Sequence, residues 1–210
     1  MVLLVEETNH RDTETQRNQK LMSAELDKLV NDVRAIGDDA HASFGKLSAE
    51  QLNWKPAADR WSVAQCLDHL ITSNNGYFPI IESVRSGQRK TSFWERLPVL
   101  PGLAGGLLIK SLDPASARKI RAPKRFEPAQ SNLSPTIVDD FVAQQSKVAE
   151  AMNATRHLDL GKIVITSPAL SIVTYSLMDG FRIIVVHEQR HLQQAKRVTA
   201  ESAFPREQSA

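Results

Sequence analysis

Two histidines four residues apart carry the strongest chemical signal in the sequence. They lie in HEQRH, residues 187–191, which has the H-E-x-x-H form of zinc proteases, with His187 and His191 as ligands and Glu188 as general base. Residues four apart share one face of a helix, so the two imidazoles can reach one metal ion. Two ligands do not complete a site, and another residue must supply the third donor.

The protease interpretation fails at this third ligand. A zinc protease needs a further His or Glu, normally downstream of the pair. No histidine follows His191, and Glu201 and Glu207 are the only glutamates left before the end of the sequence. The sequence after His191 also lacks the glycine and the third histidine of the longer metalloprotease pattern. We therefore do not expect protease activity.

An upstream histidine fits the site better. His69 lies in WSVAQCLDHLI, residues 61–71, on a predicted helix that can direct inward residues to the same point as the helix carrying HEQRH. Three neutral nitrogen ligands leave coordination positions open for water or substrate, as in catalytic sites. The alternative is that these are ordinary core histidines bonded to backbone carbonyls. His10, His41 and His157 fit less well, because they fall in the N-terminal tail, near the end of the first predicted helix and in a polar turn.

Four amphipathic helices are predicted to position these histidines. Apolar side chains recur every three or four residues along each of them, which is the period of one helix face. The sharpest pattern belongs to the last helix, where His187 and His191 occupy adjacent positions on the core-facing side. The helices are expected at about 14–45, 62–87 and 170–200, and the third is expected to begin at Ser134-Pro135.

Local signals mark where the second helix begins and bends. Ser62 followed by Gln65 is a capping-box pattern. Gly76 and Pro79 predict a kink rather than an end, because proline removes one helical hydrogen bond. The helix is expected to end near Gly87, and the preceding residues 47–61 are interpreted as a connection.

Residues 88–133 form the least regular part of the sequence. They contain five prolines and the glycine-rich run LPGLAGGLL, and we expect them to pack over the bundle with short helices near 103–112 and 93–97. GKIVITSPA, residues 161–169, predicts a short extended link. The predicted fold is an all-α, up-and-down-type four-helix bundle with a long irregular insertion between helices 2 and 3.

Composition favours one domain with a cytoplasmic location. The chain has 210 residues, of which 41% are hydrophobic, and we expect a folded core over about 14–200 with disordered tails. A single cysteine excludes an internal disulfide framework and suits a reducing compartment.

The N-terminus does not resemble a signal peptide, and no apolar stretch is long enough to span a bilayer. The net charge of +2 requires neither a nucleic-acid nor a membrane partner, and we expect neither.

A basic stretch stands out within the irregular part. RKIRAPKR, residues 118–125, holds five basic residues in eight. It lacks the interleaved aromatic residues that stack on nucleic-acid bases. We interpret it as a solvated loop, with the steering of an anionic substrate as the alternative.

Several motifs together resemble the DinB/YfiT-like superfamily of four-helix metalloproteins. The resemblance rests on WSVAQCLDHL, HEQRHLQQ and the proline-rich middle that contains APKRFEP, and it covers about 20–200. It implies that His69, His187 and His191 bind one divalent metal ion, which is zinc, nickel, iron or manganese in such proteins. It also implies a thiol-dependent chemistry, because characterised members include S-transferases and an isomerase that use bacillithiol, mycothiol or similar thiols.

Since one fold supports many chemistries, the resemblance defines the site better than the reaction. We expect a metal-dependent transferase that acts on a small-molecule substrate with a low-molecular-weight thiol as cosubstrate. The alternatives are a metal-dependent hydrolase and a non-catalytic, stress-related metal- or ligand-binding protein. We also expect a homodimer.

Other polar residues near the histidines have a functional and a structural interpretation. Cys66 lies one turn before His69 and is a fourth ligand, a reactive thiol or a small core residue. Glu188 is a base, a group that orients a ligand, or the partner of an arginine such as Arg85 or Arg190. The candidate pocket residues, which are otherwise ordinary polar residues at the bundle edge, are Asn74, Tyr77 and Gln194. Trp54 and Trp61, which flank the start of the second helix, are both interpreted as packing residues.

Overall fold

The protein is all-α, with one small hairpin. The computed structural model describes residues 2–96, 100–113, 126–128 and 132–206. The helices are α1 (Val2–Phe44), α2 (Ala49–Asn53), α3 (Val63–Asn75), α4 (Phe78–Arg85), α5 (Leu100–Leu112), α6 (Ile137–Ala154) and α7 (Leu177–Thr199), with a 3-10 turn η1 (Trp94–Arg96). Two strands, β1 (Val164–Thr166) and β2 (Thr174–Ser176), pair antiparallel. The expected all-α helical bundle is confirmed.

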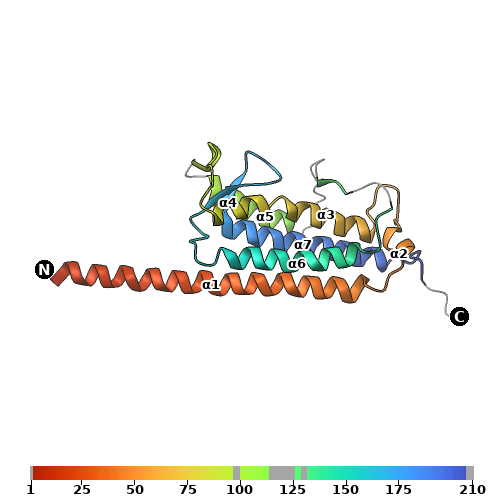
Figure 1. Cartoon of the computed structure of the whole chain (residues 1–210), viewed down its shortest axis with the longest axis horizontal. Helices are drawn as coiled ribbons and strands as arrows, with labels where there is room; N and C mark the ends of the chain where they lie inside the picture. Colours follow the sequence, from red (N-terminus) through yellow and green to blue (C-terminus); the bar gives the residue numbers. More distant parts are fainter. Residues whose placement is uncertain (1, 97–99, 114–125, 129–131, 207–210) are drawn as a thin grey trace.

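Four long helices, α1, α3, α6 and α7, form the bundle (Figure 1). Both α1 and α3 pack against α6 and α7. Ion pairs from Glu25 to Arg182 and from Asp39 to Lys196 align α1 parallel to α7. The direction of successive helices is therefore up, down, down, up rather than strictly alternating, because the insertion after α4 returns the chain to the end of the bundle where α2 lies before α6 begins.

Apolar side chains from all four helices fill the interior. Fully buried examples are Leu26, Leu67, Phe141 and Phe181, one from each helix. Burying such a side chain stabilises the fold by about 1.5–3 kcal/mol. This core fixes α3 against α7, which are the two helices that carry the histidines of interest.

The first helix is longer than expected. It begins at Val2 rather than near residue 14, because the chain has no glycine before Gly37 and no proline before Pro56 to interrupt it. Its N-terminal part projects beyond the bundle (Figure 1). Residues 16–21 are exposed, and Leu26 is the first buried side chain among the described ones.

The second predicted helix is present but divided. The capping box is confirmed, since Ser62 Oγ accepts from the Gln65 amide at 3.1 Å and Gln65 Oε1 accepts from the Ser62 amide at 3.2 Å. The expected kink separates two helices, α3 and α4. The break is local because Gly76 and Tyr77 keep helical backbone angles, whereas Pro79 has no N–H to donate to the preceding turn.

Two elements were not anticipated. Residues 47–61, expected to be a connection, contain the short helix α2, whose start is held by a second capping box of Ser48 and Gln51. The last helix begins at Leu177 rather than near 170, because the preceding residues form β2. The central pair of the hairpin, Ile165 and Tyr175, is completely buried and anchors it to the bundle.

The insertion contains both helices expected in it. The turn η1 corresponds to the predicted helix near 93–97, and α5 to the one near 103–112. Helix α5 packs against α7 and β2. The basic stretch 118–125 lies outside the described residues. No helix in the described ranges is long and apolar enough to cross a membrane.

Candidate metal centre

Three histidines from α3 and α7 converge on one point. One ring nitrogen of each of His69, His187 and His191 lies within 4.8 Å of the others. Nε2 of His69 and Nε2 of His187 are 3.1 Å apart. The ring of His191 is centred 4.6 Å from that of His69 and 4.7 Å from that of His187. The structure thus brings together the three histidines that the sequence singled out.

A backbone carbonyl of the insertion fixes the tautomer of His69. Its Nδ1 donates to the Phe126 carbonyl oxygen at 2.6 Å, and since a carbonyl only accepts, Nδ1 carries the proton. Nε2 therefore carries the lone pair, which is directed toward Nε2 of His187. Burial lowers the pKa of His69, while the Phe126 bond and the charge of Asp68 act in the opposite direction. Metal-binding histidines are typically oriented by such a bond on their second nitrogen.

The other two histidines are also held neutral. Burial, followed by the smaller effects of the nearby His69 and Arg190, lowers the pKa of His187 to about 3. Burial also lowers the pKa of His191 well below its ordinary value. The nearby His187, His69 and Arg190 act in the same direction with smaller effects. Because only a neutral imidazole can bind a metal ion, protons do not compete for these nitrogens near pH 7.

These donors fit a divalent metal ion. Two nitrogens each about 2.1 Å from a tetrahedral ion are about 3.4 Å apart. The observed Nε2 separation of 3.1 Å is close to that spacing. Nδ1 of His191 is buried and has no hydrogen-bond partner among the described residues. Imidazole donors suit zinc, nickel and iron, and three of them leave further coordination positions. His69, His187 and His191 could therefore hold one such ion.

Glu188 points away from this centre and into the bundle. The side chain is completely buried, and its Oε1 accepts from Asn74 Nδ2 at 2.7 Å. Asn74 also donates to Gln144 Oε1 at 3.0 Å. Burial raises the pKa of Glu188 to about 7, although Asn74 and the nearby Gln145 lower it. The sequence offered a signal for this polar layer, since both glutamines follow Phe141 by one turn on the core-facing side of α6.

The expected ion pair of Glu188 with an arginine is wrong. None of the salt bridges between described residues includes Glu188. Arg85 pairs with Glu82, and Arg190 donates to the Asp113 carbonyl oxygen at 3.1 Å. The reason is geometric, because a residue about 100° around the helix from His187 faces the neighbouring helices here rather than solvent.

Two other candidate residues are separate from the histidines. Cys66 is fully buried, and burial raises the pKa of its thiol to about 12. It does not belong to the group of potential ligands, so the structure favours a core residue. The Tyr77 hydroxyl hydrogen-bonds to that of Tyr175 at 2.8 Å in a buried pair.

Gln194 and Trp61 do adjoin the histidines. Gln194 interacts with His191 one turn along α7 and raises its pKa slightly against the effect of burial. Trp61 contacts both His69 and His191, with ring centroids 4.9 and 5.5 Å away. Sequence reasoning missed this role of Trp61, because an isolated tryptophan before a helix is normally a packing residue.

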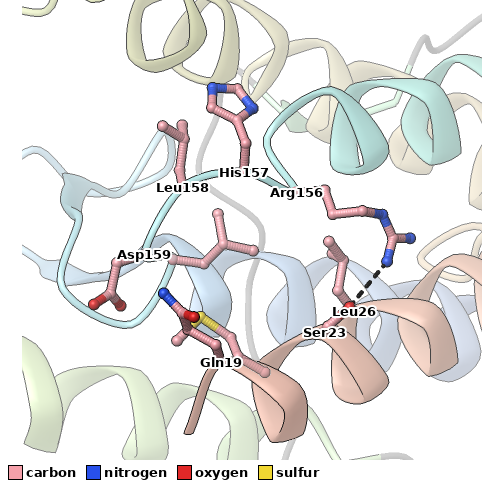
Figure 2. Close-up of a pocket in the computed structure, with 9 residues that line it drawn as sticks. Gln19, Ser23, Leu26, Arg156, His157, Leu158 and Asp159 are labelled. Carbon is pink, nitrogen blue, oxygen red and sulfur yellow. Dashed lines mark hydrogen bonds between the residues drawn. The ribbon is translucent and has the colours of Figure 1, made fainter. Parts of the chain in front are cut away.

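Two surface cavities lie elsewhere. One, of about 330 Å³, is where the chain leaves α6 beside α1, and Figure 2 shows Arg156 reaching across to Ser23 at its edge. It is lined by Gln19, Met22, Ser23, Leu26, Arg156, His157, Leu158, Asp159 and Leu160. The other is lined by Asp38, His41, Asp139, Val142, Ala143 and Ser146. His41 and His157 therefore belong to surface grooves, and neither groove includes one of the three central histidines.

Comparison with known proteins places the chain in a family. The family model described as the DinB superfamily matches residues 33–195, which include all three histidines and more than half of the chain. No curated protein and no solved structure gave a match. The protein belongs to the DinB superfamily.

Proposed function

We propose that the protein binds one divalent metal ion through His69, His187 and His191 and uses it in a thiol-dependent transfer reaction on a small-molecule substrate. The observation that carries this proposal is the convergence of three neutral ring nitrogens from two helices. When bound, a divalent ion would lower the pKa of a coordinated thiol or water and so supply a nucleophile near neutral pH. Zinc, nickel, iron and manganese are the candidate metals.

The residues around the histidines support this chemistry. The Phe126 carbonyl holds His69 in the tautomer that presents Nε2, and burial keeps His187 neutral. Because none of the three donors is negatively charged, the centre would keep the full charge of a divalent ion. Such a centre favours an anionic ligand, and a thiolate is one.

An external thiol fits this site better than the thiol of Cys66 or a water molecule activated by Glu188. Cys66 is excluded as a nucleophile because its thiol is buried and its pKa is about 12. Glu188, the general base that a hydrolase would need, is bonded to Asn74 inside the bundle. The first observation favours an external thiol over Cys66, and the second favours a low-molecular-weight thiol cosubstrate over the water of a metal-dependent hydrolase.

A non-catalytic function is the second candidate. An enzyme needs space beside its metal for a thiol and an electrophile. Without such space, the same histidines would serve a stress-related metal- or ligand-binding protein. The homodimer and the cytoplasmic location expected from the sequence remain predictions.

Metal content of histidine variants tests the site. Protein purified without chelators or a nickel column is expected to contain one metal ion per chain by elemental analysis. His69→Ala, His187→Ala and His191→Ala are each expected to lose it, because each removes one of three donors. His41→Ala and His157→Ala are matched controls and are expected to retain it. Undiminished metal content in His69→Ala would remove α3 from the site.

The same metal-loaded proteins test the reaction. S-transfer from several low-molecular-weight thiols to generic electrophiles is expected in the wild type and is expected to vanish with a histidine ligand. Glu188→Gln is expected to lower the rate by at most about 10- to 100-fold, as residues beyond the ligands do. If Glu188→Gln keeps its metal but is as inactive as His187→Ala, water becomes the favoured nucleophile. No turnover with any thiol would favour the non-catalytic candidate.

A further inference from the structure

Trp61 contacts two of the three histidines. Its ring stacks on that of His191, with the planes inclined by 24° and the centroids 5.5 Å apart. It also lies against His69, with centroids 4.9 Å apart and planes inclined by 54°. The other tryptophan that flanks α3, Trp54, instead packs edge-on against Phe204, away from the histidines.

The indole is held by the start of α3. Trp61 directly precedes Ser62, whose backbone and side chain are both engaged in the capping box with Gln65. Ser62 is only 1% exposed, so this backbone is fixed within the bundle. A tryptophan has only two side-chain torsions and loses little entropy when it is ordered. The indole of Trp61 is therefore held in place at the start of α3, and it reaches His191 on α7.

The plane of His191 needs such a support. His69 is oriented by its bond to the Phe126 carbonyl, which lies on a separate segment of the chain. Gln194 interacts with the His191 ring from the next turn of α7. A single hydrogen bond fixes the direction of one ring atom but allows the ring to turn about that bond. Stacking fixes the plane itself.

We infer that Trp61 is a positioning residue of the metal centre, which holds the ring planes of His191 and His69 so that their nitrogens converge. The inference rests on the proposed metal binding. Without the indole, His191 would populate other rotamers, and the apparent affinity would fall by the fraction of chains that keep the binding arrangement. Groups that orient metal ligands typically contribute about 10- to 100-fold in affinity.

The test compares Trp61→Ala, Trp61→Phe and Trp54→Ala in the full chain. Zn²⁺ affinity is measured by competition with a chromophoric chelator, and the visible spectrum of the Co²⁺-loaded protein reports the geometry of the ligands. Thermal unfolding of the metal-free proteins measures structural damage separately. Trp61→Ala is expected to bind about 10- to 100-fold more weakly and to change the Co²⁺ spectrum. Trp61→Phe keeps a stacking ring and is expected to restore both.

Trp54→Ala is the matched control, because it removes an indole of similar packing from the same end of the bundle. It is expected to lower the unfolding temperature but to keep wild-type affinity and spectrum. Wild-type affinity and spectrum in Trp61→Ala would overturn the inference and leave the metal site intact. Equal weakening in all three variants, in step with lost stability, would show a merely structural role and would also overturn it. Failure of the wild type to bind metal would overturn the proposed function and the inference together.

Discussion

His187 and Glu188 are neighbours in the sequence, but they face different surroundings. His187 faces the other two histidines, and Glu188 faces Asn74 in the bundle interior. Burial shifts both pKa values toward the neutral form, to about 3 for His187 and to about 7 for Glu188. The interior of the bundle is therefore a place where charge of either sign is disfavoured.

The raised pKa of Glu188 predicts a pH-dependent effect on stability. The folded state holds this proton more tightly than the unfolded state, whose carboxyl has an ordinary pKa near 4.5. The favourable contribution of Glu188 is therefore complete below about pH 4.5 and is lost as pH rises toward 7. Glu188→Gln cannot ionise, so its stability relative to wild type is expected to increase between pH 5 and pH 8, by up to about 3 kcal/mol.

Urea unfolding of metal-free protein at pH 5 and pH 8 measures this difference. Glu82→Gln is a suitable control, because Glu82 is exposed and its bond to Arg85 lowers its pKa instead. That variant is not expected to gain stability relative to wild type as pH rises. A Glu188→Gln difference that is the same at both pH values would contradict the buried position of Glu188.

At the scale of elements, the close approach of α5 to α7 depends on one glycine. A Cβ on Gly105 would lie 2.8 Å from Oδ2 of Asp179. Asp179 cannot move away freely, because Arg182 and Ser176 both hydrogen-bond to its carboxylate. The adjacent Gly106 has no atom within 4 Å of the corresponding position.

These two glycines predict opposite effects of the same substitution. Gly105→Ala is expected to destabilise the protein by about 1–3 kcal/mol through overpacking, partly offset by the higher helix propensity of alanine. Gly106→Ala has only the propensity term and is expected to stabilise by up to about 1 kcal/mol. Thermal unfolding of both variants is the measurement. An equal effect of the two substitutions would show that α5 does not rest on Asp179.

Elements with long periodic patterns or local caps could be predicted from the sequence, and those that depend on distant partners could not. The helices that carry His69, His187 and His191 follow from apolar spacing and from the Ser62 capping box. Helix α2 was missed because five residues are too few to show a period, although Ser48 and Gln51 repeat the same capping signal. Strand β2 was missed because its assignment depends on pairing with β1, which local sequence does not reveal.

The candidate site divides in the same way. The three histidines could be predicted because helical spacing alone puts two of them on one face, and bundle packing brings the third near. The contact of Trp61 and the interior position of Glu188 could not, because both depend on how α3, α6 and α7 are rotated against one another. Family resemblance supplied the ligand set but not these surroundings.

For the whole molecule, the insertion decides the order of helix directions. Helices α3 and α6 run parallel, as do α1 and α7, because the chain returns along the bundle between α4 and α6. The number of residues in a connection permits such a return but does not require it. The sequence therefore predicted the helical bundle, but the up-and-down order of directions expected from it differs from the observed order. The same insertion supplies the Phe126 carbonyl to His69, and so the connection also contributes to the site.

The projecting part of α1 has a hydrodynamic consequence. A helix of 43 residues is about 65 Å long at about 1.5 Å per residue, whereas α7, with 23 residues, is about 35 Å long. A particle with such a rod at one end has a large frictional coefficient for its mass. A single chain of 23.4 kDa is therefore expected to elute from a sizing column ahead of globular standards of equal mass, toward the position of a pair. Sedimentation equilibrium or light scattering gives the molar mass regardless of shape and therefore the number of chains in the particle. A difference between that mass and the apparent mass from the sizing column measures how elongated the particle is.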